Sequence, residues 1–450
     1  MRFFESKLSF VLFLISIPLL FMPKINLINV GNETAGLRFD DLFLLTVAAL
    51  IMLTHGLSRK KLYNIEGWIL ILTGFSILSF LSNRFLVSLQ VVHLDAKVFY
   101  AVRLLEYFMF FYIGTMAFQF DQKGKIIRFF FLWNFFLMIL QKLNLAGAVT
   151  VLGYDADVSS RAQGIASFPS EMGLLLNLMF CYLIYDPAPA RMINLFSSPM
   201  SRHFLRKSYL YWMFTLFSIL VIFTGNRISL LALLLCFLCR MKQQFNFRSI
   251  SSIIMMSILI PIVIATSAFV ITKTAAIYHR SAGLFSLNNL ELAVVVWQEI
   301  DLEKDPVGNE VISSQDYDAS WWMRIHKWIH VIKAFVSNPS VYLQGLGPGY
   351  AWSALDGGVL RIIIENGLIG AFFYWKFFSH IYRINTQTRW MCFAFFLNLI
   401  FFDAYLAYKT MSFFLFAVGH CFQKELQQQK LQKDMIALPL PAKVSGYLNT

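Results

Sequence analysis

The chain of 450 residues is 58% hydrophobic and 14% charged, whereas soluble globular proteins carry about 25% charged residues. Its formal net charge is +13, which suggests nucleic acid as a partner until the placement of the basic residues is considered. The composition excludes a soluble domain of any size. The five cysteines lie in or at the ends of apolar runs, which argues against a disulfide framework.

Apolar runs long enough to cross a hydrocarbon core of about 30 Å recur along the whole chain. They predict about twelve transmembrane helices, at 8–23, 40–55, 66–82, 98–118, 126–145, 169–185, 209–224, 228–240, 250–271, 357–378, 389–402 and 404–421. The first run follows Arg2 and Lys7, as in a signal peptide, but no small-residue cleavage site comes after it. We therefore expect it to remain as an anchor in an all-α polytopic membrane protein.

One connection is much longer than the others and spans about 85 residues, at 272–356, so we expect it to be partly ordered. Apolar and aromatic residues recur at helical spacing in 320–339, which predicts an amphipathic helix at the membrane interface. The GLGPG segment at 345–349 follows no strand, so it predicts a re-entry turn and not a phosphate loop. The predicted parts are helices one to nine (1–271), the long loop (272–356), helices ten to twelve (357–421) and a tail (422–450).

Lysine and arginine gather on alternate connections, which is the signal that orients membrane proteins. The basic connections are 59–61, 123–128, 191–207, 240–248, 376–389 and the tail from 424 to 443. This pattern predicts a bacterial inner-membrane protein with both termini in the cytoplasm and the long loop in the periplasm. The positive charge is mostly a topology signal, so nucleic acid is excluded as a partner.

Four arginines are not explained by this rule, because Arg161, Arg227, Arg324 and Arg361 fall on the outer side or just inside it. Placing an arginine in or near hydrocarbon costs about 2.5–3.5 kcal/mol on insertion scales, so each requires a compensating partner. One anionic ligand at the outer leaflet would compensate all four. A lipid-linked diphosphate suits this role, since the guanidinium fork matches pairs of phosphate oxygens.

Structural alternatives exist for several of these basic residues. Arg361 could pair with Glu365 one helical turn away, and Arg324 could extend from an interfacial helix toward water. Arg103 and Glu106, three residues apart in the fourth predicted span, are expected to form a structural pair. Arg161 and Arg227 have no obvious local acidic partner, which favours a ligand role for both.

Four segments of the chain resemble motifs of the superfamily of Wzy-type polysaccharide repeat-unit polymerases and O-antigen ligases, and they occur in the same order as in that superfamily. They are RFDDLFLL (38–45), RAQGIASFPSEMGLLL (161–176), TGNRISLLALL (224–234) and the stretch from Arg324 through NPSVYLQGLGPG to ENGLIG (365–370). The resemblance covers most of the chain and implies a fold like that of the GT-C glycosyltransferases. Ligase members carry His, then Asn, Ser or Gln, then nine residues and Gly-x-x-Gly. Here Asp356 replaces the histidine at that spacing, which favours the polymerase.

By this resemblance, the chain joins oligosaccharide repeat units carried on undecaprenyl diphosphate at the periplasmic face. A hydroxyl of one unit attacks the anomeric carbon of another and releases undecaprenyl diphosphate, with inversion of that carbon. The implied ligands of the diphosphate are Arg161, Arg227, Arg361 and Arg324. Asp356, or as second candidate Glu171, would accept the proton of the hydroxyl. The leaving group is already a good anion, so neither a metal nor another cofactor is expected.

Several alternatives remain open at this point. Asp356 could instead cap the helix that begins at Gly357. His326 and His330 lie one turn apart, but without a third ligand nearby they predict a packing role and no metal site. A ligase would transfer the glycan to lipid A-core, and a flippase would move the same lipid-linked sugars, although no internal repeat supports transport. Expected partners are the lipid-linked oligosaccharide, membrane lipid, and a chain-length regulator and flippase of the same pathway.

Overall fold

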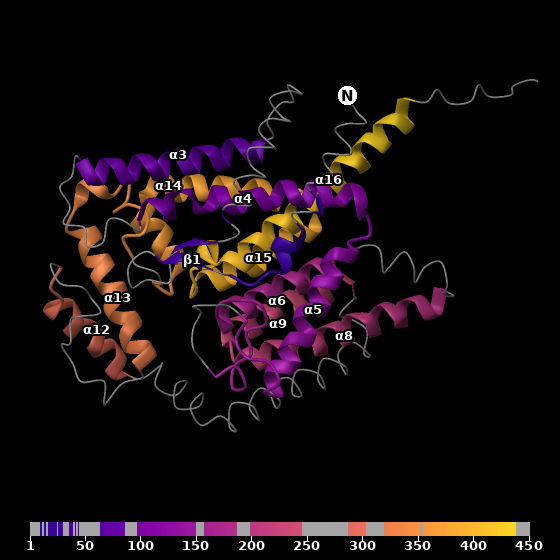
Figure 1. The fold of residues 1–450 in the computed structure, drawn as a ribbon, viewed down its shortest axis with the longest axis horizontal. Coiled ribbons are helices and arrows are strands. Elements are labelled where there is room, and N and C mark those ends of the chain that lie inside the picture. The colour runs from indigo at the N-terminus through magenta and orange to yellow at the C-terminus, as the bar shows by residue number, and fades with distance from the viewer. Residues whose placement is uncertain are drawn as a thin grey trace, which may run out of the picture.

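The computed structural model describes residues 64–85, 97–149, 157–186, 199–244, 287–302, 319–351 and 354–437, with parts of 10–44. The described chain is almost entirely helical (Figure 1). Its elements are β1 (Asn26–Asn29), β2 (Gly36–Arg38), α3 (Asn64–Phe85), α4 (Lys97–Phe120), α5 (Lys125–Lys142), α6 (Pro169–Ile184), α8 (Pro199–Thr224), α9 (Arg227–Gln244), α12 (Leu287–Glu299), α13 (Ala319–Val336), η2 (Pro339–Val341), α14 (Gly358–Tyr382), α15 (Thr386–Leu399), η3 (Ala404–Leu406) and α16 (Tyr408–Ala437). The two short strands pair antiparallel.

The predicted spans from 66–82 to 228–240 and from 357–378 to 404–421 each fall on a helix. The span 250–271 lies outside the described residues, and 8–23 and 40–55 lie only partly within them. One difference is that α16 continues to Ala437, through most of the predicted tail. Its extension is rich in glutamine, lysine and leucine, which are strong helix formers.

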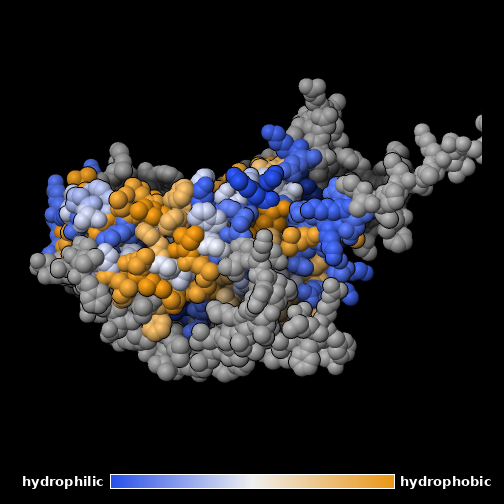
Figure 2. Space-filling model, turned by 90° about the horizontal axis from the view of Figure 1, so that it is seen from above, coloured by the Kyte–Doolittle hydropathy of each residue, from blue (hydrophilic) through white to orange (hydrophobic). Residues whose placement is uncertain are grey.

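Three of the described helices are long and apolar enough to cross a membrane, over Asn64–Asn83, Phe99–Phe120 and Gly358–Tyr382. Large hydrophobic side chains on their outer faces are exposed, among them Leu78 and Trp375. Figure 2 shows such side chains gathered over the middle of one face, with hydrophilic side chains toward both ends. A surface of this kind suits contact with lipid and indicates an all-α membrane protein.

Two glycines let α4 and α16 pack backbone against backbone. A Cβ atom at Gly114 would collide with the carbonyl oxygen of Phe416, and one at Gly419 with that of Phe111. Small residues at such contacts are the usual device for packing helices in lipid. The backbones of α4 and α16 therefore lie in direct contact.

The order of ring contacts shows that α4 and α16 run parallel. The ring centroids of Tyr107 and Tyr408 lie 5.9 Å apart, and further along both helices those of Phe118 and His420 lie 5.1 Å apart. In contrast, α3 and α14 run antiparallel, since Trp68 contacts His380 while Ser76 donates to Asn366.

The helix ends gather into two groups, at opposite ends of the molecule. At one end the carboxylate of Asp186 accepts from Arg128 and from Lys424, each at 3.3 Å. We call this the basic end, because Arg128, Lys424 and Arg240 lie together there around Asp186 and Tyr185. At the other end the loop before α14 packs against α13, which lies away from the α16 tail in Figure 1. We call this the α13 end.

An irregular segment, 161–168, enters the bundle at the α13 end, and its residues 162–167 are buried. The amide of Gln141 holds it, with Oε1 accepting from the backbone N–H of Gln163 (3.1 Å) and of Gly164 (2.8 Å). Asn134, two turns earlier on α5, accepts from the N–H of Ile165. Non-helical backbone is tolerated at membrane depth only when protein groups satisfy it in this way.

A second irregular segment, 342–347, inserts where α14 is broken at Gly367, whose φ of 63° lies in the left-handed region. It replaces the helical hydrogen bonds lost at the break. The bonds run from the N–H of Leu346 to Ile364 O (2.7 Å), Gly347 to Glu365 O (3.0 Å), Leu368 to Tyr342 O (3.0 Å) and Ile369 to Leu343 O (3.2 Å). The turn predicted at 345–349 is confirmed, with positive φ at all three of its glycines.

The predicted amphipathic helix is confirmed as α13. Its apolar residues Ile325 and Ile329 pack against α12, while Val331 and Ala334 pack against the inserted segment. Trp328 Nε1 donates to the carbonyl of Leu355 at 2.8 Å. This helix thereby holds the loop that leads into α14.

Candidate functional site

A cavity of about 120 Å³ lies at the α13 end, between α4, the start of α6, the loop before α14 and the start of α16. Its charged lining comprises Lys24, Arg103, Glu171, Asp356 and Asp403. The two carboxylates predicted as candidate bases, Asp356 and Glu171, therefore line one cavity although they are far apart in the sequence. The buried segment 161–168 ends at this cavity with Ser167 and Phe168.

Asp356 forms an ion pair with a second predicted site residue, since Arg324 Nε donates to its Oδ2 at 3.1 Å. Among the described residues, no group donates to its other oxygen, Oδ1. Its side chain is 38% exposed, and its backbone has a φ of 57°, a left-handed conformation that aspartate and asparagine tolerate best among non-glycine residues. A half-exposed carboxylate with one open oxygen can accept a proton from a ligand.

The alternative in which Asp356 caps α14 is wrong. The N-cap residue is Gly357, and no described side chain makes a cap hydrogen bond to the first turn. Asp403 instead binds the backbone of this loop, accepting from Leu355 N–H at 2.7 Å and Gly357 N–H at 3.2 Å. Asp403, an acid between the last two predicted spans, is a site residue that was not predicted from the sequence.

Arg361 is fully buried and does not line the cavity. Its Nε donates to Glu365 at 3.0 Å, and its Nη1 donates to Asp403 at 2.9 Å. The pairing with Glu365 that was the structural alternative is therefore present, with a second carboxylate added. Because Asp403 in turn holds the loop that carries Asp356, Arg361 is placed to position that loop and not to contact a ligand.

Glu171 is also buried, and both of its oxygens are occupied by backbone donors. Its Oε2 accepts from Ser167 N–H at 2.8 Å, just before α6, and its Oε1 accepts from Lys409 N–H at 2.8 Å and from Thr410 N–H at 3.4 Å. The first turns of helices leave N–H groups without helical partners, and a carboxylate is well suited to them. Glu171 thus joins the starts of α6 and α16, which makes Asp356 the better candidate for the base.

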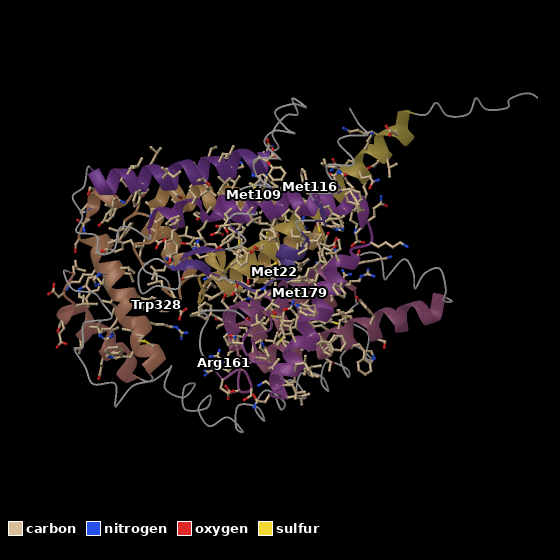
Figure 3. The ribbon with its side chains drawn as sticks, in the orientation of Figure 1. Met22, Met109, Met116, Arg161, Met179 and Trp328 are labelled. Carbon is tan, nitrogen blue, oxygen red and sulfur yellow. The ribbon has the colours of Figure 1, made fainter. Side chains whose placement is uncertain are left out.

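Arg161 lies against the turn that contains Arg227. Its Nε donates to the carbonyl of Thr224 at 3.2 Å, next to Gly225, whose φ of 65° makes the tight turn. Asn226 links this turn to the first turn of α6. The structure therefore brings the two segments carrying these arginines together beside the first turn of α6, and neither arginine is among the residues that line the cavity. Figure 3 places Arg161 and Trp328 in the half of the molecule away from the α16 tail.

Arg103 differs from its predicted role as a structural partner of Glu106. It makes no ion pair with Glu106, and its guanidinium lies over the ring of Tyr100, with 6.0 Å between its Cζ and the ring centroid. Arg361 lies over the same ring at 5.4 Å. The prediction for Arg103 was wrong because helical spacing alone does not show which side chain faces a cavity.

His326 has the packing role expected of it. Its Nδ1 lies 3.0 Å from the carbonyl oxygen of Trp322, and its ring lies 4.1 Å from that indole. Burial lowers the pKa of His326, which favours the neutral ring. Both features fit a packed side chain on α13.

No protein-family model matches the chain, and no curated protein matches it. The chemistry of the site then follows from its own residues. A carboxylate with an open oxygen, set among cationic side chains, can accept a proton from a hydroxyl while an anion is held beside it.

Proposed function

We propose that this chain polymerises oligosaccharide repeat units carried on undecaprenyl diphosphate, making O-antigen or capsular polysaccharide. The observation that carries the proposal is the cavity at the α13 end, where Asp356 lies beside Arg324, Arg103 and Lys24. A base next to cations suits transfer from a sugar diphosphate to a hydroxyl. The four sequence segments that resemble repeat-unit polymerases supply the substrate class, and three of them meet around this end.

In the proposed reaction, Asp356 Oδ1 takes the proton of a hydroxyl on the acceptor unit. The hydroxyl oxygen attacks the anomeric carbon of the donor, and the bond from that carbon to the phosphate oxygen breaks. The electron pair leaves with undecaprenyl diphosphate, whose charge is stabilised by Arg161, Arg227 and Arg324. Displacement in one step inverts the anomeric carbon, and the residues present require no metal for it.

The proposed setting is a bacterial inner membrane, with about twelve crossings, both termini in the cytoplasm and the α13 end in the periplasm. The sorting of helix ends supports this topology. The helices α4 and α16 correspond to the fourth and twelfth predicted spans, and they run parallel. Two even-numbered spans of one chain cross the membrane in the same direction, so the predicted topology requires this. The basic end then faces the cytoplasm, as the positive-inside rule requires.

A reporter that is active only in the periplasm tests this topology. Fused after residue 300 it should be active, and fused after residue 60 or residue 200 it should be inactive, because basic connections remain in the cytoplasm. Enzymatic activity of each fusion, corrected for its amount in the membrane, is the measurement. Activity at residue 200 would show that the orientation or the number of spans is wrong.

The polysaccharide profile of a deletion strain tests the activity itself. Loss of a polymerase leaves one repeat unit on each lipid A-core, because single units are still exported and ligated. A gel of lipopolysaccharide should show that single step, and the plasmid-borne gene should restore the ladder. If the gel shows no glycan on any lipid A-core, the deleted gene instead encodes a ligase or a flippase.

A further inference from the structure

Arg103 lies in the second turn of α4 and lines the cavity that also contains Asp356. The residue as a whole is only 8% exposed. Within the described residues its guanidinium makes no hydrogen bond and no ion pair, and its one contact of note is with the ring of Tyr100. A buried charge without a partner is costly in any protein, so this arrangement requires an explanation.

None of the carboxylates that line the cavity accepts a hydrogen bond from Arg103, and each has another partner. Asp403 accepts from Arg361 and from two backbone N–H groups. Both oxygens of Glu171 accept from backbone N–H groups, of Ser167 just before α6 and of Lys409 in α16. Asp356 pairs with Arg324. The cavity therefore presents a guanidinium whose donors have no acceptor in the described protein.

We infer that Arg103 binds a phosphate group within this cavity, and that Lys24 contributes a second positive charge to the same site. The inference rests on the proposed function and deepens it, because Asp356 lines the same cavity. The bound group is then the phosphate attached to the sugar that is transferred. Guanidinium matches phosphate because its parallel N–H donors meet two oxygens at once.

Arg103 thereby differs from Arg161, which does not line the cavity and instead contacts the turn at Gly225. A lipid-linked diphosphate carries two phosphates, and the two groups of cations provide for both. Arg103 contacts the phosphate next to the reacting carbon, and Arg161 with Arg227 contacts the phosphate next to the lipid. Arg103 and Arg361 both lie near the ring of Tyr100, with their Cζ atoms 6.0 Å and 5.4 Å from its centroid, but only Arg361 takes part in the buried ion pairs.

Thermal unfolding of the purified full chain, in nanodiscs of phosphatidylcholine, tests the site with inorganic pyrophosphate as the probe. The parent protein should melt at a higher temperature with pyrophosphate, because a ligand that binds only the folded state stabilises it. Arg103→Gln should weaken pyrophosphate binding at least about tenfold, given the strength of charged hydrogen bonds. Arg103→Lys should restore only part of it, since a point charge lacks the fork.

The control is Arg389→Gln, which removes another guanidinium that lies over a tyrosine ring, 5.2 Å from Tyr382. Arg389 belongs to the basic end, so its loss should not change the pyrophosphate shift. Without ligand, Arg103→Gln should melt no lower than the parent, because it removes an uncompensated charge. A lower melting temperature of Arg103→Gln, with an unchanged pyrophosphate shift, would mean a structural role and overturn the inference.

Two further arms separate the sources of the phosphate. Undecaprenyl diphosphate added to the nanodiscs should stabilise the parent and not Arg103→Gln, whereas phosphatidylglycerol should act on both equally. If phosphatidylglycerol stabilises the parent but not Arg103→Gln, the site binds a lipid headgroup and the inference is overturned. The inference is also overturned if pyrophosphate does not stabilise the parent protein. If the protein binds pyrophosphate at Arg103 but polymerises no repeat units, this inference stands and the proposed function is wrong.

Discussion

Arg161→Ala and Arg227→Ala should each abolish long-chain polysaccharide while the protein still reaches the membrane. Both arginines belong to segments that meet beside the first turn of α6, where Arg161 contacts the turn at Gly225. Removing a single group that stabilises developing negative charge typically lowers the rate by about 10²–10³. Polymer length on a gel, and turnover with purified protein and lipid-linked units, are the measurements.

Lysine at either position should restore activity poorly, because an ammonium cannot reproduce the two parallel donors of guanidinium. The control is Arg240→Ala, which removes a guanidinium that lies 4.5 Å over the ring of Tyr185 at the basic end. That variant should polymerise normally. Near-normal chain length in both Arg161→Ala and Arg227→Ala would exclude these two arginines from the mechanism.

A purely structural role for Arg161 makes a different prediction. Its hydrogen bond to the carbonyl of Thr224 ties segment 161–168 to the end of α8, so alanine would lower the melting temperature. A net hydrogen bond of this kind contributes about 1 kcal/mol. Loss of polymer with a melting temperature close to that of the parent therefore separates the ligand role from the structural one.

The helices were predictable because apolar periodicity and breakers are local properties of the sequence. The predicted span 169–185 matches α6 closely, since Pro169 fits the first helical position and an apolar run follows. The turn at 345–349 was predictable for the same reason, because its glycines supply the positive φ that the turn requires.

The partners of charged residues were much less predictable, because they are decided by contacts between distant segments. Arg361 pairs with Glu365, as spacing suggested, yet it also pairs with Asp403, which no local pattern connects to it. Glu171 binds the first turn of α16, far along the chain. Arg103 was predicted to pair with Glu106, but it lines the cavity. The helices packed around α4 determine which side of α4 meets the site.

Asp356→Asn should lower turnover steeply and leave binding of the lipid-linked donor almost unchanged. General-base catalysis is typically worth about 10²–10⁴-fold, and the loss should fall in that range. Asparagine keeps the shape of the side chain and tolerates the left-handed backbone at this position, so the loop should keep its conformation. The assay uses purified enzyme and lipid-linked repeat units, with initial rates at saturating donor.

The competing role for Asp356 is to tether α13 through its ion pair with Arg324. Asparagine retains a carbonyl oxygen that can accept from Arg324 Nε, and the pair is more than one-third exposed, where ion pairs contribute little. A tether therefore predicts an almost silent substitution. Asp186→Asn serves as the matched control, because it weakens the ion pairs with Arg128 and Lys424 at the basic end, far from the cavity.

That control should retain its turnover even if it melts at a lower temperature, since Asp186 is buried and paired. A fall in rate for Asp356→Asn alone then assigns the proton transfer to this carboxylate. If Asp356→Asn polymerises within a few-fold of the parent, the base lies elsewhere and Glu171 is the next candidate. Glu171→Gln would place an amide N–H₂ group against the backbone N–H of Ser167 or of Lys409, so its melting temperature must be measured together with its rate.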